Sequence, residues 1–225
     1  MIGIILLTYN RTDYAVSTIR GVVSNLTGGE FGWYVADDGS QPEHYVRVLA
    51  ELSTRNCRLL GSHSEKLSYG GSMNRALDTL SSQVDIYLLL EDDWELRTPL
   101  DLQPFVECLT EVPRAGVVRM GYLSSGIQGH LMIHRGRGYW VLDDSQSRHH
   151  SVLAWAGHPC LVKSSYFRTH GRWPVGLQPG DTELAMAHQY RVGRGVDILW
   201  PSEFGIHGPW HHIGERQSYI YHGQL

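Results

Sequence analysis

Three consecutive carboxylates, Glu91, Asp92 and Asp93, directly follow the apolar run 86–90 and are the residues best placed for chemistry. A short apolar run rich in Ile, Leu and Tyr predicts a strand that is buried on both faces. Because charged groups are costly to bury unless they are paired or bound to a metal, we expect these carboxylates at the open end of the strand. Ligands of α/β sheets bind at that edge, and clustered oxygen ligands suit Mg²⁺ or Mn²⁺, which could in turn hold a diphosphate. The alternative is a strand that runs into an acidic surface turn.

Two other predicted strands, 2–7 and 33–36, also end in polar side chains. The residues that follow them are Thr8, Tyr9, Asn10 and Arg11 after the first strand, and Asp37 and Asp38 after the second. Up to residue 96 the chain alternates apolar runs with segments of helical periodicity, which predicts parallel strands joined by right-handed crossovers. The ends of such strands share one edge of the sheet, so we expect Thr8, Asp38 and Asp93 in a single cleft. An ordinary turn at Asp37-Asp38-Gly39 is the alternative for the second strand end.

The helices between these strands carry recognisable boundary signals. Thr12 is expected to cap a helix that stops at Gly28-Gly29, and Ser40 with Glu43 has the spacing of a capping box for the next helix. A short strand near 58–60 is followed by Gly70 and Gly71, which would allow a ligand to approach the backbone closely, although most glycine pairs are only turns. A helix with apolar positions from 73 to 80 comes next.

The second half of the chain is less regular. We expect a helix over 102–112, a strand over 117–123, antiparallel strands around 131–141, a strand at 161–162, a short helix over 164–170 and a last strand over 196–200. Asp181, which follows Pro179-Gly180, is expected to open a further helix and is also an ordinary N-cap candidate. Aromatic residues such as Trp155 fall in this half, where they could stack on sugar rings or belong to the core.

Composition limits the function classes. The 225 residues are 42% hydrophobic and show no internal repeat or low-complexity linker, which favours one domain, 1–225. A net charge of −4 gives no overall attraction to nucleic acid. The three cysteines are too far apart for a CxxC pair, and no signal peptide or apolar run of membrane-spanning length is evident, so we expect a cytoplasmic protein without a membrane segment.

Five motifs in order resemble those of GT-A-fold nucleotide-sugar glycosyltransferases of the family-2 type. They are LLTYNR after the first strand, VADDGS after the second, YGGSMNRAL at the third helix, LLLEDDWEL as a DxD-type motif, and GDTELA at a late helix start. This resemblance implies a single α/β domain with a GT-A (Rossmann-like), mixed and mostly parallel central sheet flanked by helices. It also divides the chain into a nucleotide-sugar-binding half, 1–96, and an acceptor-binding and catalytic-base half, 97–225.

The resemblance assigns roles to individual residues. Asp93 would bind Mn²⁺ or Mg²⁺ with His207 completing the metal shell, and Asp181 would be the catalytic base. Contacts to a nucleoside-diphosphate sugar, with a UDP-sugar favoured, are expected from Thr8, Tyr9, Asn10, Arg11, Asp37, Asp38, Gly70, Gly71, Asn74, Arg75, Glu91 and Asp92. Contacts to the acceptor, which could be a glycan, a protein or a modified nucleic acid, are expected from Trp155, Gly157 and His158.

The chain departs from the family pattern at two places. Relatives usually carry Glu before the aspartate of the late motif, whereas Gly180 stands here, so Glu183 is an alternative base. Relatives usually carry Arg just before Asn74, whereas Met73 stands here, which leaves open whether Arg75 or Lys66 reaches the diphosphate.

The implied activity is a metal-dependent, inverting transfer of a sugar to an acceptor hydroxyl. The metal would act as a Lewis acid on the leaving diphosphate, and a carboxylate on the opposite side of the sugar would take the hydroxyl proton. A sugar-nucleotide nucleotidyltransferase is one alternative, but TYNR stands where that class has a glycine-rich loop with a basic residue. A non-catalytic carbohydrate-binding module on the same fold is the other.

Overall fold

One nine-stranded mixed sheet runs through the chain in the computed structural model, which describes residues 1–123, 127–143, 145, 154–157, 159–193 and 195–214. Its strands are β1 (Ile2–Thr8), β3 (Phe31–Asp37), β4 (Leu59–Ser64), β5 (Ile86–Glu91), β8 (Ala115–Arg119), β9 (Gln128–His134), β10 (Arg137–Asp143), β11 (Cys160–Lys163) and β12 (Asp197–Pro201). They are ordered β4-β3-β1-β5-β11-β8-β12-β10-β9. The predicted α/β class with a mixed central sheet is confirmed.

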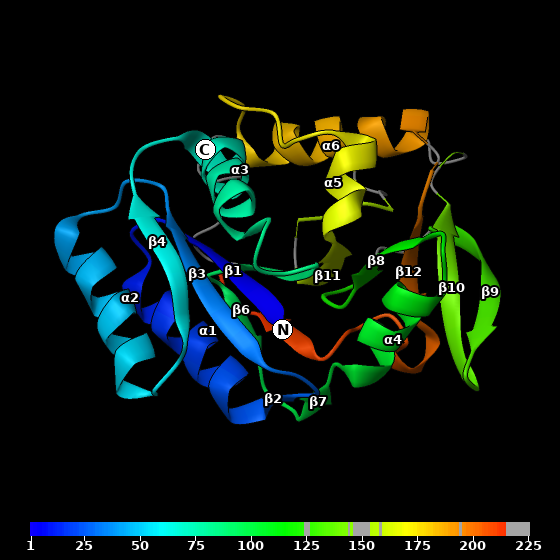
Figure 1. Cartoon of the computed structure of the whole chain (residues 1–225), viewed down its shortest axis with the longest axis horizontal. Helices are drawn as coiled ribbons and strands as arrows, with labels where there is room; N and C mark the ends of the chain where they lie inside the picture. Colours follow the sequence, from blue (N-terminus) through cyan, green and yellow to red (C-terminus); the bar gives the residue numbers. More distant parts are fainter. Residues whose placement is uncertain (124–126, 144, 146–153, 158, 194, 215–225) are drawn as a thin grey trace.

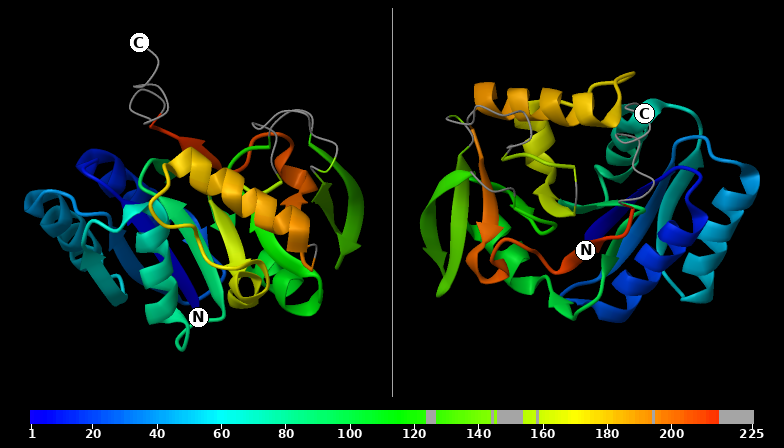
Figure 2. Two further views of the ribbon diagram at one scale, coloured as in Figure 1. Left: turned by 90° about the horizontal axis from the view of Figure 1, so that it is seen from above. Right: turned by 180° about the vertical axis from the view of Figure 1, so that it is seen from behind.

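Helices cover both faces of this sheet (Figures 1 and 2). They are α1 (Thr12–Asn25), α2 (Pro42–Thr54), α3 (Ser68–Leu80), α4 (Gln103–Glu111), α5 (Ser164–His170) and α6 (Pro179–Gly193), with a short 3₁₀ helix η1 (Ser202–Phe204). Successive side chains of a strand point to opposite faces. Ile4 and Leu6 of β1 therefore join the core under α1, α2 and α4, while Ile5 and Leu7 join the core under α3, α5 and α6. This double burial explains why β1 is a continuous apolar run.

The predicted parallel order of the first half is confirmed. β4, β3, β1 and β5 are parallel, and the register pairs Thr8 with Asp37 and Leu7 with Glu91. The polar strand ends identified in the sequence therefore lie next to one another. β11, by contrast, lies antiparallel between β5 and β8 and joins the two halves of the sheet, an arrangement without a local sequence signal.

Two small sheets complete the fold. β6 (Trp94–Leu96) pairs antiparallel with β13 (Trp210–His212), and β2 (Leu26–Thr27) pairs parallel with β7 (Leu100–Asp101). The β6–β13 register places His212 opposite Trp94, the residue after the acidic stretch. A segment from the far end of the chain therefore borders the carboxylates.

Several expected boundaries are wrong in detail. Arg11, not Thr12, occupies the N-cap position of α1, and no side chain caps that helix end. The Ser40–Glu43 capping box is not formed, because Gln41 is the N-cap of α2 and the Ser40 hydroxyl donates to Asp37 instead. The nearby Asp37 carboxylate thus binds the Ser40 hydroxyl in place of the first turn of α2.

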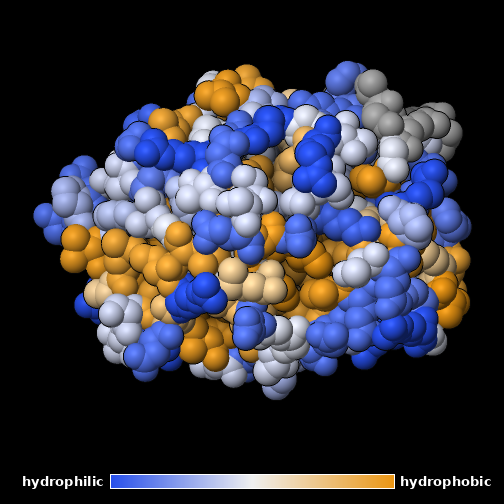
Figure 3. Space-filling model, in the orientation of Figure 1, coloured by the Kyte–Doolittle hydropathy of each residue, from blue (hydrophilic) through white to orange (hydrophobic). Residues whose placement is uncertain are grey.

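The surface alternates between hydrophilic and hydrophobic zones. In the view of Figure 3, hydrophobic residues form a band over the sheet, between the more hydrophilic surfaces above and below it. Within the described ranges, no helix has both the length and the hydropathy that a bilayer crossing requires.

Candidate active site

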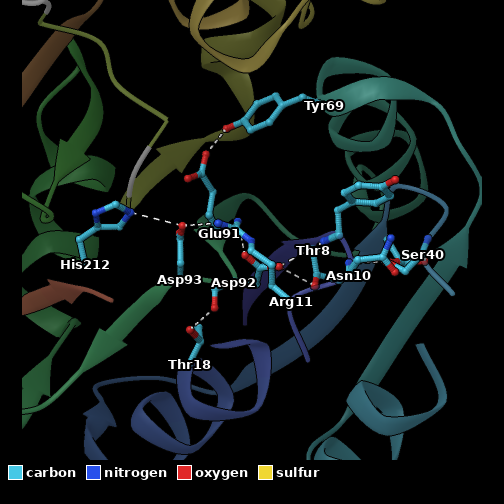
Figure 4. A network of polar contacts seen from close by, with 12 residues as sticks. Thr8, Asn10, Arg11, Thr18, Ser40, Tyr69, Glu91, Asp92, Asp93 and His212 are labelled. Carbon is cyan, nitrogen blue, oxygen red and sulfur yellow. Dashed lines mark hydrogen bonds and ion pairs between the residues drawn. The ribbon is translucent and has the colours of Figure 1, made fainter. Parts of the chain in front are cut away.

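The three carboxylates that follow β5 point toward three different partners (Figure 4). Glu91 accepts a hydrogen bond from the Tyr69 hydroxyl at 2.8 Å, Asp92 accepts one from Thr8, and Asp93 lies against His212. The stretch is therefore not an acidic surface turn. It is the centre of a polar network that α1, α3 and β13 surround.

Asp92 ties the loop after β1 to the end of β5. Its fully buried carboxylate accepts from the Thr8 hydroxyl at 2.7 Å and from the Tyr9 N–H at 3.2 Å, and its carbonyl accepts from Thr18 at 2.7 Å. Burial raises the pKa of Asp92 to about 6, although Arg11 opposes this shift. The contacts give Thr8 and Asp92 a positioning role toward each other, while the expected donor contacts of both residues stay predictions.

Asp93 has the features of a cation ligand. Its side chain is almost fully buried, with Oδ2 2.5 Å from Arg11 Nη1 and 3.3 Å from His212 Nε2. Burial would raise the pKa of Asp93, but His212 and Arg11 outweigh burial and lower it, which favours the ionised form. The other oxygen, Oδ1, is buried and has no hydrogen-bond partner in the described part of the chain. Such an oxygen fits a hard cation.

Arg11 is the cation that lies between the acidic residues. One guanidinium nitrogen pairs with Asp93 and another with Asp92 Oδ1. Burial alone would lower the pKa of Arg11, but Asp92, Asp93 and Glu91 raise it above its ordinary value. Arg11 is thus held in place by the carboxylates.

His212, rather than the expected His207, is the histidine that contacts Asp93. The β6–β13 pairing brings it there, and the Ile213 N–H donates to the Asp93 carbonyl at 2.8 Å. His207 is exposed, bridges the backbone of Tyr122 and lines a pocket of about 460 Å³ beside Phe204. No contact among the described residues supports His207 as a metal ligand.

The described residues contain no group of three or more His, Cys, Asp and Glu side chains arranged around one ion. Among the described residues, an ion at this position would therefore meet at most Asp93 and His212 as protein ligands. Ions such as Mg²⁺ commonly take their remaining ligands from substrate phosphates and water. The pair fits that kind of partial protein site.

A second cluster forms around Gly157, where Tyr69, Glu91 and Glu183 converge. The Gly157 N–H donates to Glu183, and a Cβ at Gly157 would lie 2.7 Å from the Tyr69 hydroxyl and 3.3 Å from Glu91 Oε1. Burial, reinforced by Asp93 and Glu183, raises the pKa of Glu91 well above its usual range, and burial also raises that of Glu183. The site therefore contains carboxyls that hold protons more tightly than free ones do.

Asp181 lies apart from this cluster. It is exposed in the first turn of α6, whereas Glu183, two residues later, is half-buried and bound to Gly157. The assignment of Asp181 as the base stays a prediction.

Asp38 is the centre of the expected nucleotide pocket. Its carboxylate accepts from Lys66 Nζ at 2.8 Å, from the Leu67 N–H at 2.8 Å and from the Ser72 hydroxyl at 3.2 Å. Lys66 Nζ also lies 3.9 Å from the centre of the Tyr9 ring. Tyr9, Asp38 and Lys66 are thus brought together as one group, which combines an aromatic face with a charged acceptor and a charged donor.

Asp37 and Asn10 shape the backbone beside that pocket. Fully buried Asp37 accepts from the Ser40 N–H at 3.0 Å and from the Ser64 hydroxyl. Asn10 has a positive φ of 52°; its N–H donates to Ser40 Oγ at 2.8 Å and its side chain accepts from the Gln41 N–H at 2.8 Å. These contacts hold the two strand ends together and give both residues a structural role, while their expected contacts to the donor stay predictions.

The glycine pair of α3 lies against other parts of the protein. A Cβ at Gly70 would lie 1.8 Å from the Pro174 carbonyl oxygen, so this glycine permits a close approach of α3 to the segment before α6. A Cβ at Gly71 would lie 3.0 Å from the Leu67 Cβ, so Gly71 packs against the N-cap residue of its own helix. Both glycines therefore have a packing role, while their expected ligand role stays a prediction.

Asn74 and Arg75 also contact protein groups. The Asn74 side chain donates to the Trp173 carbonyl at 2.8 Å and accepts from the Trp173 N–H at 3.0 Å. Arg75 pairs with exposed Glu65. Asn74 thus joins α3 to the segment before α6, while the ion pair of Arg75 lies on the surface.

The expected acceptor residues divide three ways. Trp155 is completely buried and stacks on Tyr166 at 5.3 Å, so it belongs to the core, whereas the Gly157 backbone belongs to the site. His158 lies outside the described residues. Buried Arg119, which no sequence motif marked, donates to the carbonyls of Ala154 at 2.7 Å and Tyr122 at 2.9 Å and so braces the segment that leads to Gly157.

Two solved structures with a similar fold are complexes with a nucleotide sugar. A mannosyltransferase, PcManGT from Pyrobaculum calidifontis in complex with GDP-Man and Mn²⁺, gives a TM-score of 0.61 at 16% identity over 89% of this chain and 54% of that one. S. aureus TarS 1-349 in complex with UDP-GlcNAc gives 0.61 at 14% identity over 88% of this chain and 57% of that one. The chain therefore spans only a little over half the length of each. No curated protein sequence matches it.

A family model matches most of the chain. The model described as Glycosyl transferase family 2 matches residues 3–170, which include β1, the acidic stretch and the Gly157 segment. The match and the fold agree with the ordered motifs in the sequence. The chain belongs to glycosyl transferase family 2.

Proposed function

We propose that this glycosyltransferase moves a sugar from a nucleoside-diphosphate sugar to an acceptor hydroxyl, with inversion and with the help of a divalent metal. The observation that carries the proposal is the buried Asp93 beside His212, one oxygen of which has no hydrogen-bond partner among the described residues. Membership of a glycosyltransferase family disfavours both a nucleotidyltransferase and a non-catalytic carbohydrate-binding module.

We propose Asp93 and His212 as the protein ligands of Mn²⁺ or Mg²⁺, with His212 in the role first expected for His207. The metal would neutralise charge on the departing diphosphate. The Mn²⁺ in the PcManGT complex supports this choice of ion.

The donor would bind along the polar strand ends of the first half, 1–96. Asp38 accepts three hydrogen bonds, one of them from the largely exposed Lys66 side chain, which can yield to a base N–H. The Tyr9 ring beside it offers a stacking face. The similar structures are complexes with GDP-Man and with UDP-GlcNAc, and we propose a UDP-sugar.

The second half, 97–225, would supply the catalytic base and the acceptor contacts. We propose Asp181 as the base, because its exposed carboxylate at the start of α6 is accessible to an incoming hydroxyl. Glu183 would instead hold the acceptor-side segment through Gly157. With Asp93 holding the metal at the leaving diphosphate and Asp181 acting as the base on the opposite side of the sugar, the displacement would be in line and would invert the configuration.

The acceptor would be a hydroxyl of a glycan, a protein or a modified nucleic acid. We also propose a cytoplasmic location, which is supported by Cys57, Cys108 and Cys160 being free thiols.

The experiment is a panel of nucleotide sugars incubated with the protein, with Mn²⁺ or with EDTA, and assayed for nucleoside diphosphate release. We expect release with one sugar nucleotide and its loss in EDTA and in Asp93→Ala. His212→Ala should weaken Mn²⁺ binding on the order of tenfold or more, whereas His207→Ala should bind Mn²⁺ like the wild type. Full turnover in EDTA would contradict the metal proposal. A loss of Mn²⁺ binding in His207→Ala but not in His212→Ala would instead make His207 the metal ligand.

A further inference from the structure

Arg11 makes a bridge between two carboxylates whose other contacts differ. Its Nη1 lies 2.5 Å from Asp93 Oδ2, and its Nη2 pairs with Asp92 Oδ1 (Figure 4). Asp92 is otherwise bound by Thr8 and Tyr9, so its position is fixed independently of Arg11. Asp93 has only His212 as a second side-chain partner among the described residues.

Both carboxylates need a positive counter-ion. Asp92 is fully buried and Asp93 is 3% exposed, and a buried charge that lacks a partner is strongly destabilising. Arg11 supplies that charge to both. A divalent ion on the unpartnered Oδ1 of Asp93 would supply it as well, and the ion would then repel the guanidinium that lies on Oδ2 of the same carboxylate.

The backbone of Arg11 is anchored in α1 independently of the two ion pairs of its side chain. It is the N-cap residue of α1, its carbonyl accepts from the Ala15 N–H at 3.0 Å, and no side-chain cap is made. The side chain is 23% exposed, so its guanidinium has a path to the solvent-facing side of the network. The helix can therefore stay in place while the guanidinium moves.

We propose that Arg11 and the divalent ion are alternating counter-ions of the Asp92–Asp93 pair. Without the ion, Arg11 holds both carboxylates. When the ion binds Asp93, Arg11 keeps its contact with Asp92 and turns its freed N–H groups to the donor diphosphate, for which a guanidinium has matching donor geometry. This inference rests on the proposed function, because it requires a metal on Asp93.

The exchange makes metal and donor binding interdependent. Without donor, the ion binds Asp93 against the positive charge of Arg11 unless that guanidinium moves away, so the affinity for the ion is lowered. With donor, the displaced guanidinium gains a new partner, so each ligand strengthens the binding of the other. Arg11 would then be a positioning residue that delays metal binding until the donor arrives.

The test measures Mn²⁺ binding to the donor-free protein by calorimetry and by electron paramagnetic resonance of free Mn²⁺. In Arg11→Gln we expect Mn²⁺ to bind on the order of tenfold more tightly than in the wild type, because displacement is no longer needed. We also expect a lower Tm without metal and a larger rise of Tm with Mn²⁺. The strengthening of Mn²⁺ binding by UDP should be smaller in this variant.

The matched control is Arg135→Gln. Arg135 also bridges two carboxylates, Glu107 and Glu111, at 2.6 and 2.5 Å, but on the surface. The Arg135→Gln substitution should leave the Mn²⁺ affinity unchanged. Arg11→Lys keeps the charge but not the bidentate contact, so its Mn²⁺ affinity should lie between those of the wild type and Arg11→Gln. This variant replaces Arg11→Gln in the test if the glutamine variant does not fold.

The outcomes separate the two proposals. The first outcome is that the wild type binds Mn²⁺ with UDP, but neither Arg11 variant binds Mn²⁺ more tightly than the wild type in the absence of donor. This outcome would overturn the counter-ion exchange and would leave the proposal of a metal-dependent reaction intact. A wild type that binds no Mn²⁺ even with UDP and turns over in EDTA would overturn the metal proposal itself, and Arg11 would be the permanent counter-ion.

Discussion

Replacing Gly70 by alanine tests whether this glycine approaches a ligand or another part of the protein. An added Cβ would lie 1.8 Å from the Pro174 carbonyl oxygen, whereas an ordinary van der Waals contact needs at least 3.4 Å. The segment around Pro174 must therefore move by about 1.6 Å, or α3 must move away from it. We expect Gly70→Ala to lower the free energy of unfolding.

The size of the effect follows from what fixes the segment. Two hydrogen bonds join the Asn74 side chain to the backbone of Trp173, and losing both costs about 2 kcal/mol at about 1 kcal/mol each. Overpacking adds about 1–3 kcal/mol. Alanine in place of glycine in a helix returns about 1 kcal/mol. The expected destabilisation is about 2–4 kcal/mol.

Equilibrium unfolding in urea measures this change, and calorimetry with UDP and Mn²⁺ measures binding. Gly180→Ala is the control, because a Cβ there meets no atom within 4 Å, and its stability should be unchanged or slightly higher. If Gly70→Ala were as stable as Gly180→Ala but no longer bound UDP, the packing explanation would be wrong and Gly70 would be a ligand contact.

Three further predictions concern the base, the nucleotide pocket and pH. Asp181→Asn should lower turnover on the order of 10²-fold with donor affinity unchanged. Glu183→Gln should change turnover little, because its amide oxygen still accepts a hydrogen bond from the Gly157 N–H. The opposite pattern in steady-state kinetics would make Glu183 the base. Asp38→Ala should weaken UDP binding by about 1–3 kcal/mol in calorimetry, and an unaffected Kd would leave Asp38 a purely structural role. Burial lowers the pKa of His170 from 6.5, so protons bind the unfolded state more readily and stability should fall as pH drops below 6.5. His170→Phe should therefore reduce the fall of Tm between about pH 7.5 and 5.5, and an equal fall in both proteins would exclude this cause.

The first half of the fold was predictable because its signals are local. Each buried strand is an apolar run, each run ends at a polar or glycine-containing turn, and the alternation with helices fixes parallel order. The strand β11 was expected at 161–162, but its place in the sheet has no such local signal. Its antiparallel place between β5 and β8 depends on pairings such as Cys160 with Leu89, which are distant in the sequence.

The site was predictable where chemistry forces a position, and less so where a residue type serves two purposes. Carboxylates after a buried strand must lie at its open end, and Glu91, Asp92 and Asp93 do. Gly70 and Asn74 have the residue types of a ligand loop, but a glycine that admits Pro174 looks the same in a sequence as one that admits a phosphate.

The histidine beside Asp93 illustrates why spacing alone cannot identify a partner. A C-terminal histidine was expected there, but β12 is followed by η1 and a turn, so the chain reaches the acidic stretch only at β13. The β6–β13 register then decides which side chain faces Asp93, because successive residues of a strand point to opposite sides. His212, 119 residues from Asp93, meets that condition, whereas the backbone of His207 pairs with Tyr122 and its side chain is exposed. The family pattern could therefore predict that a histidine borders the carboxylates. Which histidine of the sequence does so depends on the pairing of the two three-residue strands β6 and β13.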